Sequence, residues 1–294
     1  MDMTCEMDDS STLAKPPIGT GLVGMTLCIL SMISVQAGAA LSGPVMQELG
    51  SFGTTWLRLL FAAFLLMSAA RPCIRKYTAR HWLSAGALGC AMAMMTLCFF
   101  ASIQYIPLSL AVAIDFLGPL TVAVLYGRGA WRILCPFIAA AGVLCLSWDG
   151  QSWATNTIGA LLALGAAVGW ACYILLMKRV GQRFSGWEGL ALSLFFAAIV
   201  ATPIGATEAF QNVTLTLLIQ TALLAILVPL MPYALEYLAL RRMQTSSFGI
   251  LMSLEPAIGA AIGLFVLEQG LAHLQMLGVI MVVGASALGS RLQR

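Results

Sequence analysis

The sequence predicts an all-α membrane protein with ten transmembrane helices, arranged as a 5+5 inverted repeat. Three observations support this prediction. The first is composition, because 60% of the 294 residues are hydrophobic and only 9% are charged, whereas about a quarter of the residues in a soluble protein are charged. The second is the placement of Lys and Arg along the chain. The third is a proline motif that occurs once in each half.

The ten predicted helices are apolar stretches, most of them near the length of about 20 residues that a helix needs to cross a bilayer. They cover residues 18–40, 54–70, 82–103, 108–126, 133–147, 157–177, 187–205, 216–238, 246–267 and 271–290. We expect the first helix to end near Gly43-Pro44. Residues 1–17 form an acidic tail without the basic region of a cleaved signal peptide, and we expect this tail in the cytoplasm.

The basic residues orient these helices. Apart from Arg58, every Lys and Arg falls before the first predicted helix, after the last one, or in alternate loops between them. Cytoplasmic loops carry the excess of Lys and Arg in membrane proteins. We therefore expect the N- and C-termini on the cytoplasmic side of the membrane.

A repeated motif divides the chain into two halves. Glu255-Pro256 lies within the ninth predicted helix, and Gly118-Pro119 lies in the fourth, 137 residues earlier. Since five is an odd number of helices, the second half must cross the membrane in the opposite sense to the first. We expect the first repeat at residues 18–150 and the second at 151–294, related by a two-fold axis in the membrane plane.

The sequence lacks the motifs of enzymes and of nucleic-acid-binding proteins. It has two His residues and no HExxH, GxSxG or phosphate-binding GKS or GKT motif. We therefore expect no enzymatic activity, no cofactor and no metal site. The basic residues are spread over loops without interleaved aromatic residues, so nucleic acid is not expected as a partner. The expected partners are the lipid bilayer and a small-molecule substrate.

Four charged residues fall inside predicted helices: Arg58, Asp115, Glu236 and Glu255. Each costs about 2.5–3.5 kcal/mol at the bilayer centre, so they are candidates for function. Glu255 is nearest the midplane and is the strongest candidate, with a structural role in a helix break as the alternative. Asp115 and Arg58 enter from outside to similar depths, so either they pair or Arg58 extends outward. Glu236 is close to the cytoplasmic face, where a site role and an interfacial role are both open.

Four prolines mark expected helix breaks: Pro119, Pro229, Pro232 and Pro256. Proline lacks the N–H that would bond the carbonyl four residues earlier, so each one leaves a carbonyl free. Such backbone is tolerated at membrane depth only where protein or a watery cavity covers it. The fourth, eighth and ninth helices are therefore expected to line a central polar path.

Three aromatic residues are candidates for the wall of this path: Tyr233, Tyr173 and Trp170. They would offer a substrate hydrogen bonds or ring faces, and the alternative is that they only pack. The predicted substrate-binding residues are therefore Glu255, Asp115, Arg58, Tyr233, Tyr173 and Trp170.

The five-plus-five plan and two sequence stretches resemble the EamA-type transporters of the drug/metabolite transporter superfamily. These stretches are MSLEPAIGAAIGLFVLEQ and AVAIDFLGPLTVAVLYG. PYALEYLALRRMQTSSFGILMSLEPA is most similar to bacterial inner-membrane exporters of threonine and homoserine. Where such relatives commonly carry Glu in the fourth helix, this chain has Asp115, which keeps the charge and shortens its reach. The resemblance implies export of small metabolites, above all amino acids, by alternating access without ATP.

Three other functions are alternatives to the export of amino acids. An exporter of drugs or other metabolites could use the same fold, and a quaternary cation would need acids and aromatic residues but no Arg. A receptor or assembly partner would need a large loop or soluble domain, and the predicted loops are short. An intramembrane enzyme would need catalytic residues that the sequence lacks. Because carboxylates inside membranes serve in proton relays, the proton is the candidate coupling ion.

The predicted topology can be tested by cysteine labelling in intact cells. Single cysteines near Arg75, Arg183 and Arg241 should be protected from an impermeant reagent added outside, because basic loops face the cytoplasm. Single cysteines near Glu48 and Glu208 should react. Labelling near Arg241 from the outside would overturn the inverted repeat.

Overall fold

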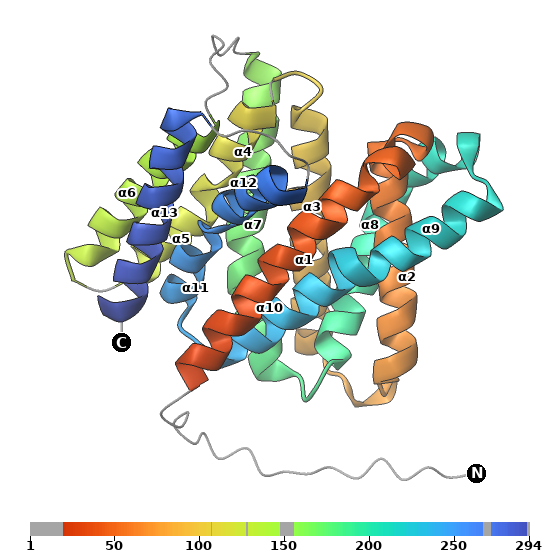
Figure 1. Cartoon of the computed structure of the whole chain (residues 1–294). Coiled ribbons are helices and arrows are strands. Elements are labelled where there is room, and N and C mark those ends of the chain that lie inside the picture. Colours follow the sequence, from red (N-terminus) through yellow and green to blue (C-terminus); the bar gives the residue numbers. More distant parts are fainter. Residues whose placement is uncertain (1–19, 107, 128, 148–155, 267–271, 293–294) are drawn as a thin grey trace.

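The structure, a computed structural model, describes residues 20–106, 108–127, 129–147, 156–266 and 272–292. The predicted tail at residues 1–17 lies outside these ranges. Within them every regular element is a helix (Figure 1), as the sequence predicted. Six helical stretches of this part of the chain are long and apolar enough to cross a membrane, and three shorter apolar helices accompany them.

The helices form one bundle, and α1 begins at the same end of the bundle at which α13 ends (Figure 1). The elements of the first half are α1 (Thr20–Leu49), α2 (Ser51–Ala70), the 3-10 helix η1 (Ile74–Lys76), α3 (Ala79–Ser102), α4 (Leu108–Asp115), α5 (Leu117–Tyr126) and α6 (Trp131–Ser147). Those of the second half are α7 (Thr157–Arg183), α8 (Glu188–Asn212), α9 (Leu215–Ala225), the π-helical turn η2 (Ile226–Leu230), α10 (Met231–Arg242), α11 (Thr245–Met252), α12 (Glu255–Val266) and α13 (His273–Leu292).

The first helix is longer than predicted. α1 passes through Gly43-Pro44, where the sequence predicted its end, and continues to Leu49. Proline is tolerated within membrane helices where surrounding groups satisfy the freed backbone, and Val45 next to it is buried. The chain turns into α2 at Gly50, whose φ of 77° is a conformation that favours glycine.

Three interruptions divide helices that would otherwise be continuous. α4 and α5 are separated at Phe116, and α11 and α12 at residues 253–254. Each interruption comes just before a proline, Pro119 or Pro256, which cannot donate a hydrogen bond to the carbonyl four residues earlier. The third interruption lies in η2, where Val228 has the non-helical angles φ −148° and ψ 118°.

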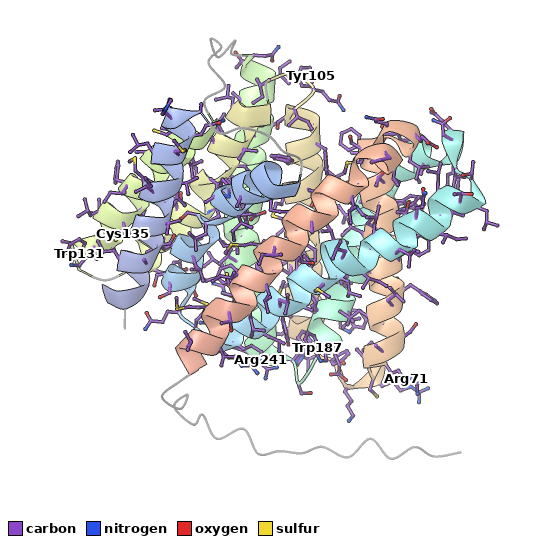
Figure 2. All side chains as sticks on the ribbon, in the orientation of Figure 1. Arg71, Tyr105, Trp131, Cys135, Trp187 and Arg241 are labelled. Atoms are coloured by element: carbon purple, nitrogen blue, oxygen red, sulfur yellow. The ribbon has the colours of Figure 1, made fainter. Side chains whose placement is uncertain are left out.

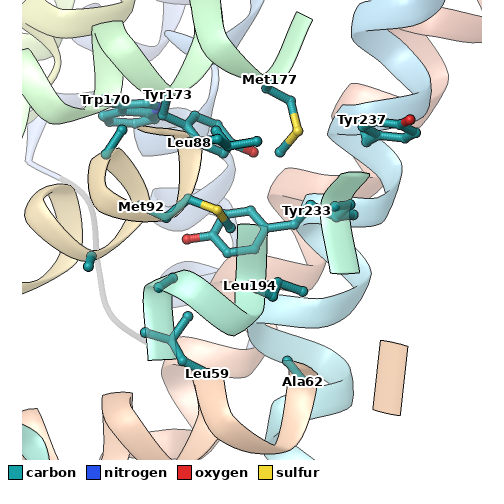
Figure 3. Packing of buried hydrophobic residues seen from close by; sticks show 14 of the residues in the cluster. Leu59, Ala62, Leu88, Met92, Trp170, Tyr173, Met177, Leu194, Tyr233 and Tyr237 are labelled. Atoms are coloured by element: carbon teal, nitrogen blue, oxygen red, sulfur yellow. The ribbon is translucent and has the colours of Figure 1, made fainter. Parts of the chain in front are cut away.

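Helices of the two halves pack against one another. α2 packs against α8, α5 against α11, and α6 against α13. α1 packs against α10 and α12, whereas α7 packs against α3, α4 and α5. One large core of buried apolar side chains joins these helices, and Figure 3 shows Leu88, Met92 and Leu194 within it. The polar residues described below lie among these apolar side chains.

Two arginines and one tryptophan lie at one end of the bundle. Figure 2 shows Arg71, Trp187 and Arg241 at the end opposite to Tyr105. Amphipathic aromatic and basic side chains are enriched where membrane proteins meet the water interface. This distribution is therefore compatible with a bundle that crosses a bilayer along its length.

Close packing depends on glycine at two positions of the bundle. A Cβ added to Gly89 of α3 would lie 2.6 Å from the carbonyl oxygen of Ser193 and 2.9 Å from the amide nitrogen of Ala197, both on α8. A Cβ added to Gly169 of α7 would lie 2.8 Å from the amide nitrogen of Met95 on α3. Small residues let membrane helices approach closely, so α3 is held tightly on both sides.

We predict that Gly89→Ala lowers thermal stability, because the backbone of α8 would have to move and overpacking costs about 1–3 kcal/mol. Gly86→Ala, one turn away on the same helix, is the matched control, since an added Cβ there meets nothing within 4 Å. Alanine favours a helix over glycine by up to about 1 kcal/mol, so the control should be as stable as the parent or more so. Melting temperatures of the purified protein in detergent provide the measurement, and equal values for both variants would contradict the packing role of Gly89.

Candidate functional site

A buried carboxylate lies where α1, α7 and α10 meet. Glu236 of α10 is 6% exposed. Its Oε1 accepts a hydrogen bond of 2.6 Å from the Ser31 hydroxyl of α1, and its Oε2 accepts one of 2.6 Å from the Tyr173 hydroxyl of α7. The Ser31 hydroxyl also lies 3.4 Å from the carbonyl oxygen of Pro232. The Glu236 side chain therefore does not extend to the surface of the bundle as an interfacial role would require, because packing of three helices encloses it.

A second carboxylate lies near the first. Glu255 is the first residue of α12 and is partly exposed, and a negative charge is stabilised at a helix N-terminus. The Gln36 side-chain amide of α1 donates to its Oε1 over 3.4 Å. The charges of Glu236 and Asp115 both act on Glu255. The three carboxylates therefore share one region of the interior.

The third carboxylate has an oxygen without a partner. Asp115 ends α4 and is 8% exposed. Within the described part of the chain, its Oδ1 is buried and accepts no hydrogen bond. The ring of the next residue, Phe116, meets the indole of Trp170 on α7 edge to face, with 4.9 Å between centroids. Since buried polar atoms in native proteins are nearly all satisfied, this oxygen marks a place where a ligand could bind.

The predicted aromatic residues lie on two neighbouring helices. Trp170 and Tyr173 belong to α7 and Tyr233 to α10, and all three are buried. The rings of Tyr173 and Tyr233 are 5.4 Å apart between centroids, and Tyr233 interacts with the side chain of Thr96 on α3. Figure 3 shows the three rings turned toward one region, whereas Tyr237 points away from it. The two tyrosines therefore form a wall beside the carboxylates.

Arg58 is buried but does not pair with an acid. Its Nη1 donates to the Ser42 hydroxyl over 2.9 Å, and its Nη2 donates to the Thr55 hydroxyl over 3.4 Å. The predicted pair with Asp115 is wrong, and so is the alternative that Arg58 extends outward, because the side chain is 5% exposed. The reason is that α2 packs chiefly against α8 and α9, which leaves the guanidinium facing hydroxyls of α1 and of its own helix. The positive charge of Arg58 interacts electrostatically with the Tyr233 side chain.

The two prolines of the η2 region differ in their effect. Pro229 lies within η2, where the helix is interrupted. Pro232 lies in the first turn of α10, where the missing N–H breaks no helical bond, so it adds no second interruption. The hydroxyl of Ser34 on α1 donates to the carbonyl oxygen of Leu227 over 2.7 Å. A side chain of α1 therefore satisfies backbone at the break.

The polar face of α1 was not predicted from the sequence. Three of its side chains donate hydrogen bonds to the second half of the chain: Ser31 to α10, Ser34 to η2 and Gln36 to α12. The available signal was the presence of three polar residues close together in an otherwise apolar stretch. Glu236 also follows Tyr233 by three residues, which places both on one helix face. That spacing could have moved Glu236 from the interface to the predicted path.

This arrangement suits an organic ligand with a positive group. Carboxylates from α4, α10 and α12 gather beside two tyrosines, and Arg58 carries a positive charge that no acid of the described residues neutralises. Among the described residues, no three His, Cys, Asp or Glu side chains are placed so that they could hold one metal ion. Carboxylate, hydroxyl and guanidinium groups are the partners that a zwitterion requires.

Comparison with known proteins places these observations in a family. The EamA-like transporter family matches residues 157–291. The threonine/homoserine exporter RhtA of Salmonella typhimurium strain LT2 is 35% identical over 266 residues, or 90% of each chain. RhtA of Escherichia coli K12 is 34% identical over 283 residues, which are 96% of this chain and 94% of the relative. A solved crystal structure with 16% identity has a TM-score of 0.74 and covers 93% of this chain and 98% of its own, so it has the same fold.

We predict that Tyr173→Phe destabilises the protein by about 1–3 kcal/mol, because the buried Oε2 of Glu236 then lacks its donor. Tyr105→Phe is the matched control. Because Tyr105 is 48% exposed, removal of its hydroxyl group should alter stability little. Thermal unfolding in detergent, followed at the same protein concentration for both variants, checks the difference. A melting temperature for Tyr173→Phe equal to that of the parent would show that this hydrogen bond contributes nothing.

Proposed function

Because the chain belongs to the EamA-like transporter family, we propose that it is a secondary transporter that exports small amino acids, such as threonine or homoserine, across the bacterial inner membrane. Relatives described as threonine/homoserine exporters align with 90% or more of the chain, which supports amino acids as the substrate class. The observation that carries the proposal is that Asp115 and Glu255, neither fully satisfied by hydrogen bonds, act on each other beside paired tyrosines inside an apolar bundle.

The proposed architecture is ten transmembrane helices in a 5+5 inverted repeat, with repeats at residues 18–150 and 151–294. In this plan three membrane crossings each consist of an interrupted helix, namely α4–α5, α9–η2–α10 and α11–α12. Both termini are cytoplasmic. The packing supports it, since α1 contacts α10 and α12 while its counterpart α7 contacts α3 and α5. Thr96 and Tyr233, which are 137 residues apart, also interact, as counterparts close to a two-fold axis would.

The proposed site holds the two ends of an amino acid separately. Asp115 and Glu255 receive the ammonium group, because Asp115 has an unpartnered oxygen and Glu255 accepts one long hydrogen bond. Arg58 meets the carboxylate, because its present partners are neutral hydroxyls. Alternating access then exposes this site to each side of the membrane in turn, with protons as the coupling ion and no ATP.

The second candidate is an exporter of drugs or other metabolites on the same fold. The aromatic rings of Tyr173, Tyr233 and Trp170 favour this candidate, since ring faces attract organic cations. The buried Arg58 argues against it, because a cationic drug offers nothing for a guanidinium to bind. Export of an amino acid and export of a cation lacking a carboxylate distinguish the two, since only the first should depend on Arg58.

We predict that Glu255→Gln reduces amino-acid export at least about tenfold, the effect of losing a charge-assisted contact of about 1.5–3 kcal/mol. Asp115→Asn should also reduce export, and more for substrates that carry an ammonium group. The measurement is efflux of labelled threonine or homoserine from loaded vesicles, normalised to the amount of protein. Glu48→Gln is the matched control, since Glu48 is exposed at the end of α1.

Three results are informative in this assay. Efflux by the wild-type protein, together with strongly reduced efflux by Glu255→Gln, would support a role of this carboxylate in transport. Wild-type rates in Glu255→Gln would leave it as a structural brace for the interruption before Pro256. Absence of efflux of either amino acid from the wild-type protein would remove the substrate class from the proposal.

A further inference from the structure

Glu236 differs from the two carboxylates assigned above to the substrate. Asp115 has an oxygen without a hydrogen bond, and the one hydrogen bond of Glu255 is 3.4 Å long. Both oxygens of Glu236, in contrast, accept hydrogen bonds of 2.6 Å from hydroxyls. An ammonium group would have to displace Ser31 or Tyr173 to reach Glu236. This carboxylate is therefore poorly placed to bind the substrate.

The surroundings of Glu236 supply no positive charge within the described residues. The titratable groups that act on it or are acted on by it are Cys28 of α1, Tyr173 of α7, Tyr233 of α10 itself and Glu255 of α12. The other elements packed against α10 are α8, η2 and α11, and their described residues contribute no charged group to this set. A small cation could neutralise Glu236. Each of its carboxylate oxygens lies 2.6 Å from a hydroxyl oxygen, which leaves no room for a metal ion, so the cation that Glu236 can accept is a proton.

The two hydroxyl partners can accommodate that proton without moving. A hydroxyl group can either donate or accept a hydrogen bond. With Glu236 ionised, Ser31 and Tyr173 donate to it, and 2.6 Å is the usual length of a hydroxyl–carboxylate bond. With Oε1 protonated, Glu236 donates to Ser31, whose own hydroxyl proton can turn to the carbonyl oxygen of Pro232 at 3.4 Å. Every polar atom of this group thus has a partner in both states.

We propose that Glu236 is the proton-binding site of the transport cycle, separate from the carboxylates that hold the substrate. This inference rests on the proposed function and adds the coupling step to it. One proton from outside binds Oε1 of Glu236 and later leaves to the cytoplasm, while one substrate molecule moves outward. No covalent bond to the substrate forms or breaks.

The positions of the acids explain how proton and substrate are exchanged. The charge of Glu236 acts on Glu255. A proton on Glu236 removes one negative charge from this region, so Glu255 and Asp115 hold an ammonium group less tightly. By linkage, a bound ammonium group disfavours the proton to the same degree. Competition of this kind is what an antiporter requires.

The test separates exchange from accumulation in liposomes that contain the purified full-length protein. Exchange is entry of labelled homoserine into liposomes loaded with unlabelled homoserine, at equal pH on both sides. Accumulation is entry into empty liposomes that are more acidic inside by about one pH unit, which can sustain about a tenfold concentration ratio for one proton per substrate. Glu236→Gln keeps the shape of the side chain and resembles the protonated state, because its amide nitrogen donates where protonated Oε1 would, but it cannot gain or lose a proton. Glu48→Gln is again the control.

We expect wild-type protein and Glu48→Gln to show both activities. Glu236→Gln should bind homoserine less tightly, keep exchange within about twofold at saturating homoserine, a change of less than 0.5 kcal/mol in barrier, and lose accumulation entirely. Accumulation by Glu236→Gln would overturn the inference, and so would loss of exchange by a folded variant, which would assign Glu236 to substrate binding. Should Glu236→Gln not fold, Glu236→Asp replaces it, and an unchanged pH dependence of accumulation in that variant would also count against the inference.

Failure of the underlying function would look different. A wild-type protein that exchanges homoserine but ignores the pH gradient would contradict proton coupling and leave the exporter standing. A wild-type protein without exchange would contradict the exporter itself.

Discussion

Polar groups inside an apolar bundle are costly unless the protein or a ligand satisfies them, and in the described part of this molecule three side chains of α1 satisfy groups of the second half. Backbone freed by an interrupted helix is costly at membrane depth unless something covers it. Ser34 bonds the carbonyl of Leu227 at the η2 break, Ser31 bonds Glu236, and Gln36 bonds Glu255. The first helix of the chain therefore supports the break at η2, whereas at the α11–α12 interruption the carbonyl of Ile250 accepts hydrogen bonds from Ser253 and from Ser286 of α13. The site, too, is assembled from both halves.

The features that could be predicted from the sequence are those with local causes. Proline acts on the carbonyl four residues before it, so Pro119 and Pro256 predict interruptions close to where the structure has them. Composition and the run lengths of apolar residues likewise predict a helical bundle in a membrane. The end of α1 could not be predicted as well, because Pro44 meets the same local rule and yet the helix continues to Leu49. A proline removes one helical hydrogen bond without obliging the helix to end, so the local rule alone does not fix this boundary.

The features that could not be predicted depend on which helices become neighbours. Counting residues placed Arg58 and Asp115 at similar depths, but depth does not say that α2 packs against α8 and α9. Ser42 is the partner that Arg58 finds instead. Glu236 was placed near the interface by its distance along the chain from Arg241, yet contacts with α1 and α7 bury it. In both cases the lateral arrangement of helices, which one sequence hardly constrains, determines the environment of the charge.

The two proposed repeats differ in the continuity of one pair of counterpart helices, α3 and α9–η2–α10. α3 runs unbroken through the bundle, and Gly89 lets it press against the backbone of α8. Its counterpart is split, because Val228 leaves the helical conformation between α9 and α10. A continuous helix resists bending, whereas sharp kinks occur where proline or another defect interrupts the hydrogen-bond ladder. In the proposed alternating-access cycle we therefore expect bending to concentrate at Val228, with α10 moving relative to a rigid pair formed by α3 and α8.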